Sequence, residues 1–167
     1  MRYSVNKKIF LMLIMFVSMS ACGFHLRGDV KLATQLNQVI FQGADIYDPL
    51  VREWTRSLTT AGSTVVEDMQ DATAIIHIQK NGGDRRVLSV GSDGKVREYE
   101  LYQTLDFSVR DAGGRELLGV QTLMLTRTYL FDSNDVLGKA GEEESLRRDM
   151  RRDLVRLAML RLEALGR

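Results

Sequence analysis

The sequence predicts an α+β domain: a sheet of about four mostly antiparallel strands with two helices packed on one face, in the order β-α-β-β-β-α. Three observations support this prediction. Residues 98–110 alternate between apolar and polar positions, as a half-buried strand does. Two stretches, 50–61 and 146–165, place apolar residues at helical spacing. Glycine-containing turns at 91–94 and 111–114 separate the strand-like runs.

The first expected elements are a strand and a helix. Residues 38–42 are a short apolar run that ends at a glycine, which predicts a strand. Asp48 can cap a helix, Pro49 suits the first helical position, and Gly62 is the expected stop. The apolar residues between them recur at helical spacing: Leu50, Trp54, Leu58 and Ala61. We expect Trp54 to pack in the core; the alternative is that it stacks on a ligand.

The next strand is interrupted by polar and glycine residues. Residues 73–79 are rich in residues that favour strands, and residues 86–90 continue the pattern. Between them, the sequence Asn-Gly-Gly-Asp at 81–84 predicts either a turn or a bulge within one longer strand. The stretch Gly-Ser-Asp-Gly at 91–94 then predicts a turn between two strands.

Two long strands should follow this turn. In the first, one face is apolar at Tyr99, Leu101, Leu105, Phe107 and Val109, and the other is polar from Glu98 to Arg110. This alternation predicts one buried face and one face that is wet or covered by a partner. Residues 116–129 form another long strand with weaker alternation, which indicates that its second face is also covered, by a partner.

A helix should end the chain. The glycines of residues 138–141 predict a break, and Glu142–Glu144 should open the helix, because acids in the first turn suit the helix dipole. Its apolar stripe consists of Leu146, Met150, Leu154, Leu157, Ala158, Leu162 and Leu165. The arginines on the remaining faces alternate with acids, so we expect a solvated surface with ion pairs between neighbouring turns.

The amino-terminal segment has the layout of a secretory signal. Arg2, Lys7 and Lys8 precede an apolar run at 9–17, and small residues follow it. The run is shorter than the about 20 residues that span a membrane. We therefore expect residues 1–21 to be a signal peptide; the alternative is a buried core helix or strand.

The single cysteine of the chain, Cys22, directly follows this segment. Residues 19–22, Met-Ser-Ala-Cys, resemble the bacterial lipobox with methionine in place of the usual leucine. The resemblance implies that Cys22 receives a diacylglycerol and becomes the acylated amino terminus, a firm membrane anchor. By resemblance to proteobacterial lipoproteins, Gly23 at the next position favours sorting to the outer membrane over retention in the inner membrane. Residues 22–37 should then be a lipidated tether, and residues 38–167 a single α+β domain.

Signatures of enzymes are missing from the sequence. The two histidines are His25, in the expected tether, and His77, in an expected strand, and neither has partners at metal-ligand spacing. The sequence also lacks a nucleophile elbow, a phosphate-binding loop and paired cysteines. We expect no catalytic activity, cofactor or metal; a hydrolase that uses His77 and nearby acids is the alternative. The formal net charge of +1 and the expected export argue against nucleic acid as a partner.

Basic residues gather near the expected strand ends and the last helix. Cations on a rigid sheet edge can hold phosphorylated ligands, since ammonium and guanidinium groups bind phosphate through charge-assisted hydrogen bonds. The alternative is a solvated surface of mixed charge. The residues concerned are Arg85, Arg86, Lys95, Arg97, Arg127 and Lys139.

Several stretches together resemble the LPS-assembly lipoprotein family, LptE. They are Cys-Gly-Phe-His-Leu-Arg at 22–27, Val-Arg-Glu-Tyr-Glu-Leu at 96–101, and Phe131-Asp132 leading to Val-Leu-Gly-Lys at 136–139. The resemblance implies two helices on a four-stranded sheet. It also implies an outer-membrane lipoprotein that faces the periplasm, plugs the large barrel of LptD, helps that barrel assemble and delivers lipopolysaccharide to the outer leaflet.

The resemblance also implies a lipopolysaccharide site. Lys139 matches one basic position of the family before the last helix. The second lies in the turn at 91–94, which has no basic residue here, so Lys95 and Arg97 beside it are the expected substitutes. Arg127 completes the set of candidate lipopolysaccharide contacts. The alternative function is a generic periplasmic lipoprotein that binds a small ligand or envelope polymer without a barrel partner.

Overall fold

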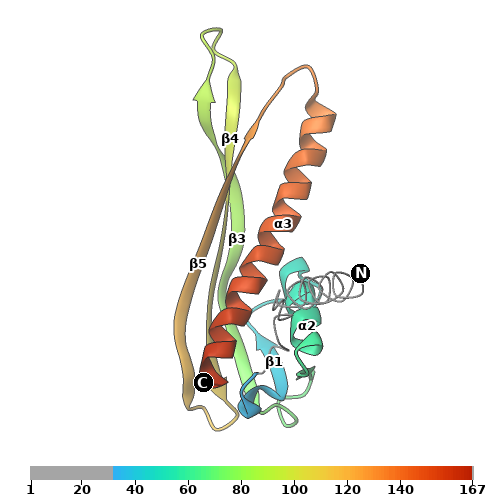
Figure 1. The fold of residues 1–167 in the computed structure, drawn as a ribbon, viewed down its shortest axis with the longest axis vertical. Coiled ribbons are helices and arrows are strands. Elements are labelled where there is room, and N and C mark those ends of the chain that lie inside the picture. The colour runs from blue at the N-terminus through green and yellow to red at the C-terminus, as the bar shows by residue number, and fades with distance from the viewer. Residues whose placement is uncertain (1–31, 167) are drawn as a thin grey trace, which may run out of the picture.

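Three long strands form an antiparallel sheet that runs the length of the molecule (Figure 1). The structure, a computed structural model, describes residues 32–166. The elements are β1 (Gln38–Gln42), α2 (Pro49–Thr60), β2 (Thr64–Val65), β3 (Ala74–Val90), β4 (Val96–Asp111), β5 (Glu116–Leu130) and α3 (Val136–Glu163), with short 3₁₀ turns at Thr34–Leu36 and Ala164–Gly166.

The sheet has the strand order β2-β1-β3-β4-β5. β1 is parallel to both of its neighbours, whereas β3, β4 and β5 are antiparallel. β1 pairs with β3 only from Ala74 to His77, so the rest of β3 forms an edge of the sheet. Both helices lie on one face, with α3 along the long strands and α2 beside β1 at the end away from the β3–β4 turn (Figure 1).

The predicted fold class is confirmed, with a small difference in strand count. The two-residue strand β2 brings the sheet to five strands, and it is too short to leave a pattern in the sequence. Residues 81–84 do not form a turn: β3 continues through them in register with β4. The nearest bulge lies earlier, where the register shifts between Ile78 and Lys80.

The sequence-based prediction placed the start of the last helix too late in the chain. α3 begins at Val136, six residues before the predicted Glu142, and it includes Gly138 and Gly141. Asp135 explains the early start, because its side chain accepts a hydrogen bond from the Gly138 nitrogen at 3.1 Å. A Cβ atom at position 138 would lie 2.3 Å from the Asp135 carboxylate, so the glycine gives this cap its room.

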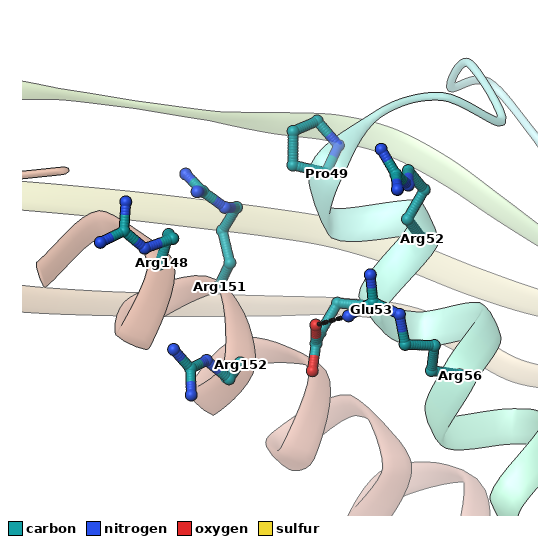
Figure 2. Close-up of a pocket in the computed structure, with 7 residues that line it drawn as sticks. All are labelled: Pro49, Arg52, Glu53, Arg56, Arg148, Arg151 and Arg152. Atoms are coloured by element: carbon teal, nitrogen blue, oxygen red, sulfur yellow. Dashed lines mark hydrogen bonds and ion pairs between the residues drawn. The ribbon is translucent and has the colours of Figure 1, made fainter. Parts of the chain in front are cut away.

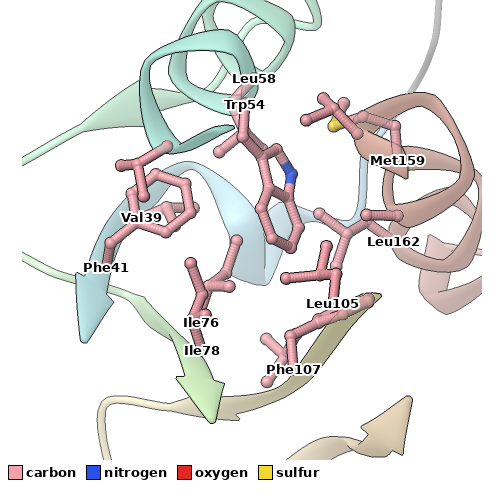
Figure 3. Close-up of a cluster of buried hydrophobic side chains, with 14 of the residues drawn as sticks. Val39, Phe41, Trp54, Leu58, Ile76, Ile78, Leu105, Phe107, Met159 and Leu162 are labelled. Atoms are coloured by element: carbon pink, nitrogen blue, oxygen red, sulfur yellow. The ribbon is translucent and has the colours of Figure 1, made fainter. Parts of the chain in front are cut away.

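The main core lies between α2, the carboxyl-terminal half of α3 and the sheet (Figure 3). Trp54 is fully buried at its centre. Its ring centroid lies 5.5 Å from that of Phe41 and 5.0 Å from that of Phe107. Trp54 is therefore a core residue, as predicted. Leu36, in the stretch predicted to form the tether, is also fully buried in this core.

A second, smaller cluster supports the other half of α3. Leu101 and Met150 are fully buried there, and Tyr129 is nearly so. Tyr99 stacks on Tyr129 with ring centroids 5.8 Å apart. Since α2 and β1 do not reach this half of the molecule, α3 alone covers the three long strands here (Figure 1).

The opposite face of the sheet carries no helix (Figure 1). The register places side chains of β3, β4 and β5 in rows across it, such as Lys80, Asp106 and Thr122. Most of its residues are polar, in agreement with the alternation of β4. β5 also presents exposed side chains on this face, including Met124 at 63% exposure, so within the described chain nothing covers it.

Candidate functional site

Three of the four predicted lipopolysaccharide contacts lie at one end of the molecule. Lys95 and Arg97 flank the start of β4 beside the β3–β4 turn, and Lys139 lies in the first turn of α3. The turn and the start of α3 both lie at the top of the view in Figure 1. We call this end, formed by residues 87–97, 130–131 and 135–139, the hairpin end.

The two cations of β4 differ in their surroundings. The guanidinium of Arg97 forms an ion pair with Asp93 at 3.2 Å. Gly91 makes room for it, because a Cβ atom at position 91 would lie 2.6 Å from the Arg97 Nε atom. Lys95 is exposed, and no carboxylate of residues 32–166 forms an ion pair with it. Both side chains are therefore available to a ligand, at the cost of at most one surface ion pair.

Lys139 and Arg127 are both held by acids. The Lys139 ammonium lies 2.8 Å from the Glu142 carboxylate, and 22% of its side chain is exposed. Arg127 lies on the helix-covered face of β5, where it forms an ion pair with Asp153 of α3 at 2.6 Å. The structure thus places Arg127 against the middle of α3, away from the hairpin end.

The hairpin end also carries exposed apolar side chains, which the sequence analysis missed and which we call the apolar rim. Leu137 is 89% exposed and Leu130 is 66% exposed. The other members, all about half exposed or more, are Val87, Leu88, Val90 and Val136. These residues end two strands and begin a helix, so only the fold brings them together. An exposed apolar patch of this kind typically marks a surface that binds lipid or protein.

A network of charged side chains ties α3 to the sheet beneath the hairpin end. One Glu143 oxygen lies 2.8 Å from the Arg85 guanidinium and accepts a hydrogen bond from the Tyr129 hydroxyl at 2.7 Å. The other accepts from Arg147 at 2.7 Å. Arg85 also lies over the ring of Tyr99, 4.6 Å from its centroid. Arg85, one of the predicted phosphate-binding cations, therefore has a structural role.

The network shifts the pKa values of three of its members: that of Glu143 is lowered, and those of Tyr129 and Arg85 are raised. Partial burial alone would raise the pKa of Glu143, but the hydrogen bonds from Tyr129, Arg147 and Arg85 outweigh it and hold that pKa below its usual value of 4.5. Burial, with the hydrogen bond to Glu143, raises the pKa of Tyr129. Glu143 is therefore charged in the folded protein at neutral pH. Its carboxylate accepts the hydrogen bonds that Arg85, Tyr129 and Arg147 donate.

We expect Glu143→Gln to lower the free energy of unfolding by about 1–2 kcal/mol at pH 7, because hydrogen bonds to charged groups contribute about this much at partly exposed sites. The folded-state pKa is lowered, so this contribution is complete above the unfolded value of 4.5 and is lost as the pH falls through the folded value. Urea unfolding of both proteins from pH 7 to pH 3 measures this. A difference that stays constant over this range would contradict the assignment.

Three residues singled out in the sequence remain to be placed: Cys22, His25 and His77. Cys22 and His25, with the predicted signal peptide, lie outside the described residues. His77 lies on β3, opposite Ser108 of β4, on the sheet face without helices. Residues 32–166 contain no group of three or more histidine, cysteine or acidic side chains placed to hold a metal ion. Over the same residues, neither helix has the length and apolar content of a membrane span.

Comparisons with known proteins identify the family. Residues 34–162 match the LptE family, described as lipopolysaccharide-assembly. The chain is 29% identical to the LPS-assembly lipoprotein LptE of Pectobacterium atrosepticum over 134 residues, which cover 79% of this chain and 71% of that protein.

Solved structures agree with the fold. An uncharacterized lipoprotein B from Nitrosomonas europaea superimposes with a TM-score of 0.68 at 32% identity, over 82% of this chain and 88% of that chain. The rare lipoprotein B from Shewanella oneidensis gives a TM-score of 0.65 at 27% identity, over 77% and 94% of the two chains. The resemblance predicted from the sequence is confirmed: the chain belongs to the LptE family.

Proposed function

We propose that this protein is a lipopolysaccharide-assembly lipoprotein of the outer membrane that plugs the LptD barrel and binds lipopolysaccharide at its hairpin end. Membership of the LptE family supports the assembly role. The observation that carries the ligand proposal is the combination of an exposed apolar rim with the cations Lys95, Arg97 and Lys139. The proposed role includes no catalytic step.

The hairpin end suits an amphipathic phosphorylated lipid. Ammonium and guanidinium groups bind phosphate oxygens through charge-assisted hydrogen bonds. The exposed apolar side chains, Leu137 and Leu130 foremost, can contact acyl chains, and each buried methylene contributes about 0.8 kcal/mol. Cations alone would attract any anion, whereas the rim adds a preference for a lipid.

The sheet face without helices suits the inside of a barrel. The lumen of an outer-membrane barrel is polar, so a plug needs side chains that form hydrogen bonds on its outer faces. Tyr102, Thr104 and Thr126 supply such groups on adjacent strands. The edge of β5 adds unpaired backbone groups, which a neighbouring polar surface can satisfy.

The barrel proposal predicts co-purification of the full-length protein with LptD after extraction from the outer membrane in mild detergent. Mass spectrometry of the same sample should find the mature chain starting at an acylated Cys22. Depletion of the protein should lower the amount of folded barrel. A protein that runs alone, with barrel levels unchanged on depletion, would contradict the plug and favour the generic periplasmic lipoprotein.

The ligand proposal predicts that Lys139→Asp combined with Arg97→Asp weakens lipopolysaccharide binding about tenfold or more, because two attractive charges become repulsive. Arg110→Asp is the control: Arg110 is an exposed residue near the opposite end of β4. Binding can be measured by pull-down or calorimetry, with circular dichroism and barrel co-purification unchanged. Equal binding by the double variant and the control would reject the site.

A further inference from the structure

A hollow between the two helices is lined mainly by arginines (Figure 2). It has a volume of about 410 Å³. Its lining residues are Pro49, Arg52, Glu53 and Arg56 of α2 and Arg148, Arg151 and Arg152 of α3. We call it the arginine hollow. It lies on the helical side of the molecule, and it contains none of the cations predicted to bind lipopolysaccharide.

The arginines converge because of their spacing on two packed helices. Arg52 and Arg56 are one turn apart on α2, and Arg148, Arg151 and Arg152 are spaced by three and four residues on α3. Residues at such spacings share one face of a helix. The two helices are held together by the main core, in which Trp54 and Leu58 of α2 share one cluster with buried residues of α3 such as Met159 (Figure 3). Cations from two helices that lie 92 to 100 positions apart in the sequence are thereby placed around one space.

The acids near the hollow do not balance its charge. Glu53 is the one acid in its lining, and it forms an ion pair with Arg56 at 3.0 Å. Glu144, outside the lining, is shared by Arg151 at 3.1 Å and Arg148 at 3.6 Å. The remaining two arginines of the lining, Arg52 and Arg152, have one acidic partner between them.

Of those two, Arg152 forms an ion pair with Asp149 at 3.1 Å, and no carboxylate of residues 32–166 forms one with Arg52. Five arginines therefore share three carboxylates. Several of these pairs are largely exposed; the Arg152 side chain, for example, is 60% exposed. Such pairs contribute little stability, so a stronger anion can replace the carboxylates.

We propose that the arginine hollow is a binding site for a phosphate-bearing anion. Guanidinium groups present paired donors that match phosphate oxygens, and a phosphomonoester carries nearly two negative charges. The excess of two arginines over carboxylates matches that charge. The volume exceeds that of a bare phosphate and falls within the range of small-molecule sites, so a phosphorylated headgroup fits as well as a free anion.

The amino-terminal end of α2, which lies beside the hollow, does not supply backbone donors for an anion. Pro49 has no backbone N–H, and Asp48 already accepts hydrogen bonds from the nitrogens of Leu50, at 2.7 Å, and Val51, at 3.4 Å. The site therefore depends on side chains, and mutation can remove it without disturbing the helix cap. It is also independent of the hairpin end, so its failure would leave the proposed function unaffected.

The test uses the full-length protein in a non-ionic detergent, with calorimetric titration at low ionic strength. The probes are inorganic pyrophosphate and, separately, detergent micelles mixed with phosphatidic acid. The variant Arg52→Gln/Arg152→Gln should bind at least about tenfold more weakly, since each lost charge-assisted hydrogen bond has an appreciable cost. The control Arg110→Gln/Arg161→Gln removes the same charge from exposed positions outside the hollow and should change binding less than about twofold.

The two probes distinguish the source of the phosphate. Binding of both, sensitive to the hollow variant alone, supports a phosphate site that also accepts a free anion. Binding of the phosphatidic acid micelles alone, with the same sensitivity, supports a lipid headgroup. Equal losses in the two variants would overturn the proposal, because they would indicate attraction by overall charge. The proposal would also be overturned if neither phosphate probe bound the unaltered protein.

Discussion

Trp54→Ala should lower the free energy of unfolding by about 3–5 kcal/mol, the usual cost of removing a large aromatic side chain from a core. Trp54 is fully buried, and it contacts Phe41 of β1 and Phe107 of β4. Its removal opens a cavity at the point where α2, α3 and the sheet meet (Figure 3). Much of the free energy that holds the two helices on the sheet depends on this one side chain.

Two further variants make this prediction specific, and urea unfolding measures all three. Tyr47→Ala removes an aromatic side chain that is 76% exposed, and it should cost less than about 0.5 kcal/mol. Trp54→Phe should cost less than Trp54→Ala, because the phenyl ring leaves a much smaller cavity than the methyl group of alanine. The indole nitrogen has no hydrogen-bond partner, so its loss leaves no group newly unsatisfied in either variant. If Trp54→Ala unfolded like the Tyr47 variant, the core assignment would be wrong and the ligand-stacking alternative would regain support.

Gly43→Ala should cost about 2–4 kcal/mol, because two separate penalties add. Gly43 follows β1 directly and has φ = +84°, in the region that residues with a Cβ atom disfavour. A Cβ atom there would also lie 2.1 Å from the carbonyl oxygen of Ile78 on β3. The backbone must therefore move, and the parallel pairing of β1 with β3 would be disturbed.

Gly62→Ala separates the two penalties. Gly62 has φ = +88°, almost the same as Gly43, but no atom lies within 4 Å of the place where its Cβ would be. This variant should lose about 1 kcal/mol, the conformational penalty alone. Thermal or urea unfolding gives both values. Equal losses at the two positions would show that the close approach of Ile78 has no energetic consequence.

The local elements were largely predictable from the sequence, because their signals are local. The apolar run that became β1, the Asp48-Pro49 start of α2 and the alternation of β4 each depend on neighbouring residues. One error arose, and one open alternative was decided, where tertiary contacts overruled a local preference. Gly138 and Gly141 predicted a break, but the Asp135 cap and the packing of α3 keep them helical. Gly82 and Gly83 were compatible with a turn, but pairing with β4 keeps them in β3.

The candidate site was predictable only in part. Lys95, Arg97 and Lys139 were identified by charge and family resemblance, and the fold places them at one end of the molecule. The exposed leucines beside them, Leu130 and Leu137, were missed. The sequence does not show whether a given apolar residue is buried or exposed. A group of exposed apolar residues can therefore be identified only after the core is known.

By itself, the sequence determined the fold class and most elements, because periodicity, caps and turns act over a few residues. The family was indicated by the resemblance of a few short stretches. The tertiary structure alone decided which charges act together. It tied Arg127 to Asp153 and Arg85 to Glu143, and it gathered arginines from two helices into one hollow. Such groupings depend on contacts between residues distant in the chain, and the energy of a charge depends on the neighbours and the burial that those contacts create.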